Sequence, residues 1–438
     1  MANVMGRIFD LGRNALLTHQ QGVNTVGHNI ANVETPGFSR QRLNLETSRP
    51  QITASGAVGT GVRADGIGRV HDRLLAGQIR SESAALGTAE ARQGLLARAE
   101  IVLDPAGGND IGTALAEFWD GWRAVAENPA GQVDRELLLG RAETLADRFG
   151  RTTANLSGLA GEAESRIREG ADAVNALSLQ VARLNDKIGA AETSGAAAND
   201  LRDRRDLALR ELSGWVEIQA VEDDAGRVGV SAAGGIALVT GGRAETIGAA
   251  DLRTGGGEGR IRGWAQAAET INGYADRVRA MAEAVRDGVN ARHTLGFDRN
   301  GEAAGNFFDP DADGLAAALT DPDRISAAVN SAGAPGDNRN ALAIAALQNE
   351  PLVDGLPVGE AHAALATRAG ADAAAAESGL DFQTGLVEEL DAYRESISGV
   401  SLDEETIQLV QYQNAYEAAA RLISTVDEML DTVMNMVR

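Results

Sequence analysis

Three aspartates in an acidic stretch have the most suggestive spacing for chemistry. In FDPDADGLAAALT, Asp309, Asp311 and Asp313 stand at alternate positions, and Gly314 takes the sixth position of a calcium-binding loop. The twelfth position is Thr320, where such a loop needs a bidentate glutamate. The spacing therefore favours an acidic turn, with a calcium site as the minor alternative.

No other pattern in the chain points to catalysis or to a resident cofactor. Cysteine is absent, which excludes disulfides and thiolate metal sites. The five histidines are scattered, and neither H-E-x-x-H nor G-x-S-x-G occurs. The glycine-rich stretches GTGVRADG and TGGGEGR lack the spacing of phosphate-binding loops. The sequence predicts that the protein is not an enzyme and has no catalytic, cofactor-binding or metal-binding residues.

Composition narrows the class of protein and its partners. Of the 438 residues, 44% are hydrophobic but only 4% are aromatic, which favours long helices over a compact enzyme core. The formal net charge of −23 makes nucleic acid an unfavourable partner. No apolar run approaches the ~18 residues of a membrane span, so no membrane insertion is expected. The first residues show no cleavable signal peptide, so composition by itself predicts a cytosolic protein.

The first 33 residues carry apolar side chains at heptad spacing, as in a coiled-coil seam. One column of the seam consists of Phe9, Leu16, Val23 and Ile30. The companion column consists of Met5, Gly12, His19, Val26 and Val33. Glycine also stands at positions 6, 22 and 27, and each glycine costs about 1 kcal/mol relative to alanine inside a helix. We expect this segment to be frayed or disordered as a lone helix in water.

The last 37 residues repeat the heptad pattern more strongly, on a helix expected from about residue 402 to the end. Its first column consists of Leu402, Leu409, Tyr416, Ile423, Leu430 and Val437. Its companion column consists of Tyr412, Ala419, Val426 and Val433. Ser401 and Glu404 form a capping-box signature. Since each seam is too narrow to be buried alone, we expect the two seams to pair with each other and with neighbours. In the assembled state the Phe9 column should pack on the Leu402 column; an ordinary bundle helix is the alternative.

A corner is predicted directly after the first helix, within NIANVETPGFSRQ. Its residues are Asn29, Asn32, Thr35, Pro36, Gly37 and Ser39. Pro36 cannot continue a helix, Gly37 permits a reversal, and Asn32 tolerates a left-handed conformation at the end of a helix. We expect this corner to separate the terminal helix from the segment that follows it.

The patterns together predict a mainly α fold. Paired coiled-coil helices at residues 1–37 and 399–438 form one domain, residues 38–71 an extended connector, and residues 72–398 a discontinuous long-helix body. Helices are expected at about 72–103, 110–127, 131–192, 199–213, 264–294, 338–350 and 358–398. A small β element is expected at about 215–263, with a hairpin at Asp223–Gly226 and a last strand in GRIRGW.

Both ends of the chain resemble bacterial flagellar axial proteins, the family of rod, hook and hook-associated subunits. NIANVETPGFSRQ resembles the family's amino-terminal signature, with Phe38 where tyrosine is common. SLDEETIQLVQYQNAYEAAARLISTVDEMLDT resembles its carboxyl-terminal signature and is most similar to members at the hook–filament junction. GVNARHTLGFDRNGEAAGNFF and GDNRNALAIAALQ look like landmarks of the family's first domain.

The resemblance implies a structural protein of the extracellular flagellum, which overrides the cytosolic prediction. Such a protein is exported unfolded through the flagellar secretion channel, polymerises at the distal end of the hook and connects the hook to the filament through its terminal helices. The implied partners are copies of itself, the hook protein, a neighbouring hook-associated protein, the export apparatus and an export chaperone on the C-terminal helix.

Larger family members carry a β-rich outer domain that this chain is expected to lack or to keep only as a vestige. That domain is inserted between two landmarks that correspond here to Phe307-Phe308 and Gly336-Asp337, which only a short acidic loop separates. A hook or rod protein remains the alternative within the family, and it would have a β-rich middle. A cytoplasmic coiled-coil scaffold and a secreted hydrolase are the alternatives outside it.

Overall fold

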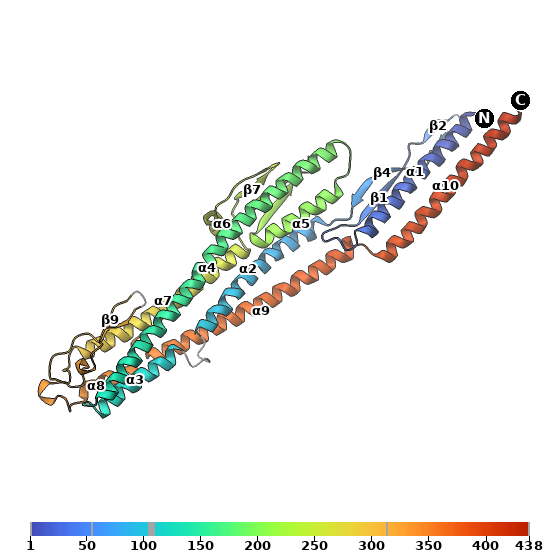
Figure 1. Ribbon diagram of the computed structural model, residues 1–438. Coiled ribbons are helices and arrows are strands. Elements are labelled where there is room, and N and C mark those ends of the chain that lie inside the picture. The colour runs from blue at the N-terminus through green and yellow to red at the C-terminus, as the bar shows by residue number, and fades with distance from the viewer. Residues whose placement is uncertain (1, 54–55, 104–109, 312–313, 437–438) are drawn as a thin grey trace. The chain divides into compact units, whose positions relative to one another are not determined.

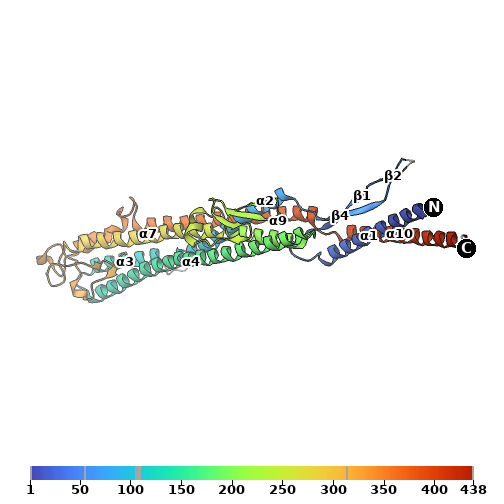
Figure 2. The same ribbon diagram turned by 90° about the horizontal axis from the view of Figure 1, so that it is seen from above.

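The computed structural model describes residues 2–53, 56–103, 110–311 and 314–436, and most of them lie in long helices (Figures 1 and 2). The helices are α1 (Ala2–Ala31), α2 (Arg73–Leu103), α3 (Ile111–Glu127), α4 (Gln132–Thr193), α5 (Asn199–Trp215), α6 (Ala249–Gly255), α7 (Arg260–His293), α8 (Arg339–Ala345), α9 (Val358–Ser398) and α10 (Leu402–Met436). Short 3-10 turns lie at Pro322–Arg324, Ser331–Gly333 and Ala346–Asn349. The predicted mainly α fold is confirmed.

The described residues form two compact units. The first contains those of Met1–Ala85, Asp172–Gly257 and Thr384–Arg438, and the second those of Leu86–Ala171 and Glu258–Gln383. Three long helices, α2, α4 and α9, contribute residues to both units. Both chain ends and the predicted corner therefore belong to the first unit.

The first unit contains a two-stranded ribbon and a small antiparallel sheet. In the ribbon, β1 (Gln41–Thr47) pairs with β4 (Val62–Arg69), and β2 (Gln51–Thr53) pairs with β3 (Gly56–Val58). The sheet has the order β5 (Ile218–Glu222), β6 (Val228–Ala232), β7 (Ala237–Thr240) and β8 (Arg243–Ala244). The predicted hairpin at Asp223–Gly226 joins β5 to β6, and Gly226 has the positive φ of 75° that such a turn favours.

One asparagine of α4 holds this sheet against the helix. Asn185 is fully buried; its Oδ1 accepts from the Val228 amide at 3.0 Å, and its Nδ2 donates to the carbonyls of Val228 and Gly241, both at 2.8 Å. Alternate residues of β6, Val228 and Val230, are buried beside it. A half-buried sheet of this size depends on such a helix for its stability.

The last predicted strand, in GRIRGW, is wrong: these residues begin helix α7. Ile261 and Trp264 are 1% and 8% exposed and lie three residues apart, which places them on one face of a helix and on opposite faces of a strand. Gly263 lies against the backbone of Thr88 in α2, so the two helices approach closely there. The small β element therefore ends at Ala244.

The second unit is centred on a cluster of aromatic rings. Trp119 and Trp122 of α3 are 2% and 0% exposed. Phe118 lies between them and the buried pair Phe307 and Phe308, with ring centroids 6.0 and 5.6 Å from those two rings. In a chain with so few aromatics, this cluster brings five of them together in one part of the core.

The acidic stretch after this cluster contains no β-rich domain among its described residues. Among the residues described between Phe308 and Asp337, only the two-residue strands β9 (Phe308–Asp309) and β10 (Ala316–Ala317) and two 3-10 turns occur. This confirms the predicted absence of the outer domain.

The calcium alternative gains no support from the described residues. Asp313 lies outside them, and within them no three His, Asp or Glu side chains are placed to hold a metal ion. The carbonyl of Gly314 instead accepts a hydrogen bond from Arg286 at 2.7 Å.

Candidate functional site: the terminal helices and the corner

Helices α1 and α10 lie side by side and antiparallel (Figures 1 and 2). Three contacts set their register: Gly12 with Ile423, Gly22 with Tyr412, and Asn29 with Glu405. Met5 and Val26 on α1 and Ala419 and Val426 on α10 are buried, with exposed fractions of 2–8%. All four belong to the companion columns of the two heptad patterns.

Two glycines of α1 serve as notches that admit side chains of α10. A Cβ added at Gly12 would lie 2.9 Å from Cγ1 of Ile423, and one added at Gly22 would lie 2.6 Å from the Tyr412 ring. At Gly6 and Gly27 an added Cβ would meet nothing within 4 Å. Glycine lowers the helix propensity of α1 at all four positions, but at Gly12 and Gly22 it is required for close packing on α10.

Gly22→Ala and Gly27→Ala should shift the stability of the helix pair in opposite directions. At position 22 the methyl group overpacks the contact with Tyr412, which typically costs 1–3 kcal/mol. At position 27 alanine meets open space and should gain up to about 1 kcal/mol from helix propensity. The measurement is the rate at which protease cleaves the terminal segments of the free chain, and a shift of both variants in the same direction would contradict the notch.

Within the single chain, the Phe9 column does not pack on the Leu402 column; their pairing in the assembled state stays a prediction. Phe9, Leu402, Tyr416 and Leu430 remain 37–50% exposed, whereas the companion residue Val426 is 2% exposed. The half-buried members of the predicted seam are Leu16, Val23, Ile30, Leu409, Tyr412, Ile423 and Val433. Val437 lies outside the described residues. Gly12 and Gly22 explain which face of α1 packs on α10, because a face with small residues permits the closer approach of the two helices.

Asn29 ties three separate segments together at the base of this pair. It is 1% exposed, and its Nδ2 donates to the Gln41 carbonyl at 2.9 Å and to Oε2 of Glu405 at 3.0 Å. Its Oδ1 accepts from the Gln41 amide at 2.9 Å. One side chain thus joins the end of α1, the start of β1 and the first turn of α10.

Replacing Asn29 by aspartate should destabilise the base of the pair by about 3 kcal/mol. The new carboxylate would face Glu405 and would leave the Gln41 carbonyl without its donor, and each lost bond to a buried polar group costs roughly 1–3 kcal/mol. Adding Glu405→Gln removes the like-charge contact and should recover part of the loss. Chemical denaturation of the four chains of this cycle measures the coupling, and strictly additive effects would contradict the contact.

The chain reverses at Gly37, which has φ = 78°. Asn32 does not adopt the left-handed conformation expected for it, since its side chain is used otherwise. Its Nδ2 donates to the His28 carbonyl at 2.9 Å, and its Oδ1 accepts from Thr35 at 3.1 Å. Pro36 is exposed and follows the helix end. Asn32 therefore caps the helix by side-chain bonds, and glycine alone makes the turn.

After the corner, Ser39 and Arg40 fasten the chain to the first unit. The Ser39 amide donates to Oδ2 of Asp203 at 3.0 Å, and the Arg40 amide donates to the Ser398 carbonyl at 2.8 Å. Burial raises the pKa of Asp203, whereas the hydrogen bond from Ser39 acts to lower that pKa. Arg40 also forms an ion pair with Glu404 of α10.

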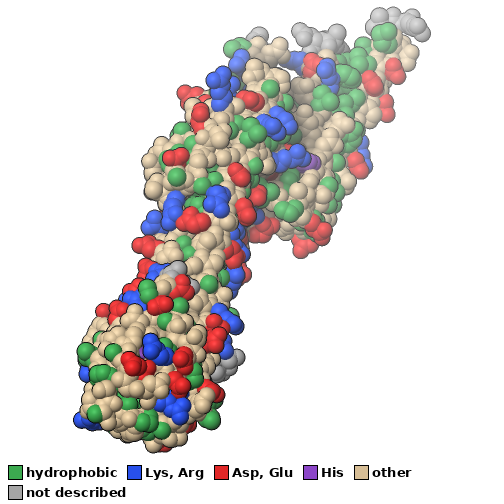
Figure 3. Space-filling model, turned by 60° about the vertical axis from the view of Figure 1, so that its left-hand side comes forward, with side chains coloured by type: hydrophobic (Ala, Val, Ile, Leu, Met, Phe, Trp, Pro, Cys, Tyr) green, Lys and Arg blue, Asp and Glu red, His purple; other side chains and the backbone are tan. Residues whose placement is uncertain are grey.

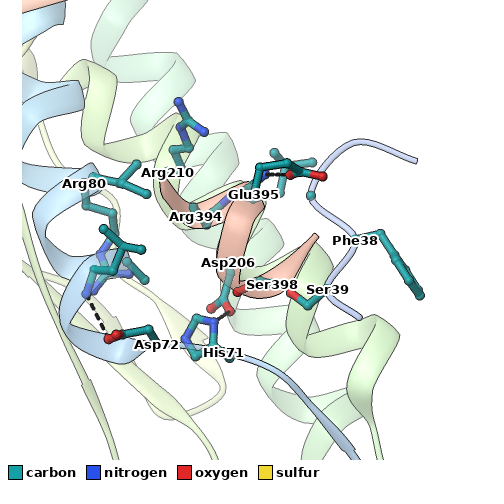
Figure 4. Close-up of a pocket in the computed structure, with 15 residues that line it drawn as sticks. Phe38, Ser39, His71, Asp72, Arg80, Asp206, Arg210, Arg394, Glu395 and Ser398 are labelled. Carbon is teal, nitrogen blue, oxygen red and sulfur yellow. Dashed lines mark hydrogen bonds and ion pairs between the residues drawn. The ribbon is translucent and has the colours of Figure 1, made fainter. Parts of the chain in front are cut away.

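A pocket beside the corner is lined by both apolar and charged side chains, and the charged ones form ion pairs with neighbouring segments (Figure 4). His71 lies 3.8 Å from Asp206, and Arg210 forms a two-fold ion pair with Asp391. Burial lowers the pKa of His71. Phe38 points away from the pocket. These charged groups form ion pairs between separate segments of the first unit, which is a structural role.

Sequence reasoning missed Gln41, Asp203 and Glu405 at this site. Glu405 stands in the run DEE at the start of α10, and it is only 1% exposed. Its partner Asn29 is 376 residues away in the sequence. A buried carboxylate in the first turn of a helix leaves no local signal.

Comparisons with known proteins agree in order along the chain. Residues 96–308 match the family model for the helical domain of flagellar hook-associated protein FlgK, and residues 394–436 match that for the C-terminal region of flagellar basal body rod FlgEFG proteins. A structure of the flagellar hook junction protein FlgK from Burkholderia pseudomallei superposes with a TM-score of 0.66 at 15% identity, covering 74% of this chain and all of that one. This last match shows the likeness of fold.

Two curated relatives are similar over nearly their whole length. Flagellar hook-associated protein 1 of Bacillus subtilis is 25% identical, over 97% of both chains. The protein of the same name from Escherichia coli is 24% identical, over 99% of this chain and all of its own. That alignment spans 551 positions against 438 residues here, so the E. coli protein has insertions that this chain lacks.

Paired terminal helices, a long-helix body and these ordered matches define a flagellar axial protein, a structural component of the bacterial flagellum. Within that class, the chain is similar over nearly its whole length to flagellar hook-associated protein 1, a structural protein of the hook–filament junction. The family match over residues 96–308 also argues against a hook or rod protein. Among the described residues, no helix is long and apolar enough to cross a membrane.

Proposed function

We propose that this protein joins the hook to the filament by packing the outer columns of α1 and α10 on neighbouring copies. The outer columns are Phe9, Leu16, Val23 and Ile30 on α1, and Leu402, Leu409, Tyr416 and Leu430 on α10. The observation that carries the proposal is that these residues stay exposed or half-buried after the two helices have paired. A heptad column of apolar side chains left in water favours association with further helices.

The free-energy balance of the α1–α10 pair favours its burial by neighbouring subunits. Within one chain, the fully buried apolar side chains of the pair are Met5, Val26, Ala419 and Val426, among the residues described. A large apolar side chain gains about 1.5–3 kcal/mol on burial, whereas fixing the backbone of each residue costs about 1–2 kcal/mol. The terminal pair is thus marginal in a free chain and becomes ordered when other subunits cover the outer columns.

The same argument assigns roles to the parts of the chain. Residues 1–37 and 399–438 act as the axial assembly domain, residues 38–71 as the connector and residues 72–398 as the body. The outer columns bind copies of the chain, the hook protein on one side and a neighbouring hook-associated protein on the other.

The exposed apolar side chains of the terminal helices also suit export of the chain in an unfolded state. The chain passes unfolded through the flagellar export channel to the outside of the cell, which suits termini that are marginal when alone. An export chaperone covers α10 beforehand, because Ile407, Val410 and Met434 add further exposed apolar side chains to that helix. Pull-down of the chaperone by the unmodified chain, and its loss on removal of residues 402–438, tests this step.

The location of the protein tests the proposal directly. In cells that lack the native gene for this chain, an epitope-tagged copy should restore motility, and immunogold label should form a single zone between hook and filament. Untagged cells are the control. Label along the whole hook or rod would favour the hook or rod alternative, and label in the cytoplasm would overturn the proposal.

A further inference from the structure

The ribbon projects from the first unit and ends in an exposed hairpin, the tip hairpin, formed by Arg49, β2 and β3 (Figure 2). At its base, β1 and β4 pack on α1. At its end, Ile52 is 88% exposed and Val58 is 44% exposed. An isolated two-stranded hairpin is at best marginally stable in water. An exposed isoleucine on such a hairpin indicates a surface that another molecule covers.

The charge of the tip hairpin restricts the partner. Arg49 is the sole charged residue between positions 47 and 62, and its side chain is exposed. Its guanidinium has no carboxylate within salt-bridge distance among the described residues. The chain as a whole is strongly acidic, so an acidic and apolar surface of a second copy is the complementary partner.

Helix α10 offers such a surface in its C-terminal half. From 402 to 436 it carries seven carboxylates and one arginine. Asp427, Leu430, Asp431 and Met434 are spaced by i, i+3, i+4 and i+7, so they share one face of the helix. Leu430 and Met434 are 37% and 66% exposed. Acidic and hydrophobic side chains also lie next to one another near the grey terminal residues in Figure 3.

The two surfaces lie on opposite flanks of α1. In both views α1 lies between the tip hairpin and α10 (Figures 1 and 2). The tip hairpin therefore does not cover the α10 face of its own chain. Copies placed side by side bring the hairpin of one to the α10 of the next, which is a heterologous contact that repeats into a ring or a helical tube.

We propose that the tip hairpin of one copy packs on the C-terminal half of α10 of a second copy, with Ile52 against Leu430 and Met434 and Arg49 beside Asp427 and Asp431. This inference rests on the proposed function, because it names one contact of that assembly. It adds the tip hairpin as a surface outside the heptad columns, and it makes Leu430 of the outer column of α10 part of the surface that receives the hairpin.

Cross-linking tests the contact, since the chain has no native cysteine and every product reports the introduced pair. Two differently tagged copies, one with Ile52→Cys and one with Met434→Cys, are expressed together, and isolated hooks are treated with a short bis-maleimide. A doubly tagged dimer is expected. The matched control pairs Ile52→Cys with Ile407→Cys, which is 59% exposed at the other end of α10 and should give at least about tenfold less dimer. Equal yields, or no dimer from hooks that contain both copies, would overturn the proposal.

A charge-reversal experiment on Arg49 and Asp431 is the second test of the contact. Arg49→Glu should lower incorporation at the hook about threefold to tenfold, and Asp431→Arg in the same chain should restore it by reversing the pair. Glu428→Arg is the control, because position 428 points to another face and should not restore incorporation. Failure of rescue by Asp431→Arg contradicts this contact. If the unmodified chain is absent from the hook–filament boundary, the proposed function itself fails, so the two failures are distinguishable.

Discussion

A chain that carries Leu402→Asp, Tyr416→Asp and Leu430→Asp should fold like the unmodified chain but should leave cells without attached filaments. These three side chains are 50%, 37% and 37% exposed, so aspartate at each position costs the free chain little. In an assembly the same positions would be buried. Losing three apolar contacts there removes about 4 kcal/mol from each subunit contact, roughly a thousandfold in affinity, before the cost of burying charge is added.

The matched control is one aspartate on the inner face of the same helix. Val426 is 2% exposed against α1, so Val426→Asp should open the terminal pair of the free chain. Protease should then cut the termini of the Val426→Asp chain faster, whereas the triple variant should be cut at the rate of the unmodified chain. Motility, filament counts by electron microscopy and cleavage rates are the three measurements.

Normal filaments on cells with the triple variant would show that the outer columns carry no assembly contact. A large drop in the melting temperature of the free triple variant would show instead that these residues belong to the folded core. The two results are separate, because one is measured on cells and the other on purified protein.

The long helices could be predicted from sequence because their signal is local and repeated. The expected range 131–192 became α4 at Gln132–Thr193, and 358–398 became α9 at Val358–Ser398. Many turns of consistent periodicity specify such helices. The strand predicted in GRIRGW failed because six residues offer too little pattern, and the burial of Ile261 and Trp264 by neighbouring helices decides their conformation.

The site was predictable only in part, for a related reason. Heptad spacing identified the apolar columns of both termini, but it could not show which column faces inward. That choice depends on the fit of Gly12 to Ile423 and of Gly22 to Tyr412, across about four hundred residues of sequence. The corner was found from Pro36 and Gly37, whereas the bonds of Asn29 to Gln41 and Glu405 depend on the tertiary fold.

The second unit should lose stability as the pH falls from about 6.5 to about 4, and His293 should account for a large part of the loss, beside His362, whose pKa burial also lowers. His293 is 0% exposed, and its Nδ1 donates to the Gly305 carbonyl at 2.7 Å while its Nε2 accepts from the Ser326 amide at 3.0 Å. This arrangement requires a neutral ring, because protonated Nε2 would face the Ser326 amide donor. Burial lowers the pKa of His293 to about 4.

The sign follows from proton binding. The unfolded chain binds a proton at His293 near pH 6.5 and the folded chain only near pH 4, so the stabilisation is complete above pH 6.5 and is lost as the pH falls toward 4. The difference corresponds to about 3 kcal/mol. Carboxylates with lowered pKa values, such as Glu162, lose their contributions at lower pH, because their unfolded pKa lies near 4.5.

Denaturant unfolding, followed by tryptophan fluorescence between pH 8 and pH 4.5, measures this effect where it arises, because the Trp122 ring lies 6.1 Å from the His293 ring. His293→Gln keeps one donor and one acceptor but does not titrate, so its unfolding free energy should change with pH much less than that of the unmodified chain. An unchanged slope in His293→Gln would mean that the acid sensitivity arises elsewhere, and a steeper one would mean that the buried ring is protonated in the folded chain. The expected flattening would show that this histidine is kept neutral to hold the loop at Gly305 and Ser326 on the aromatic core.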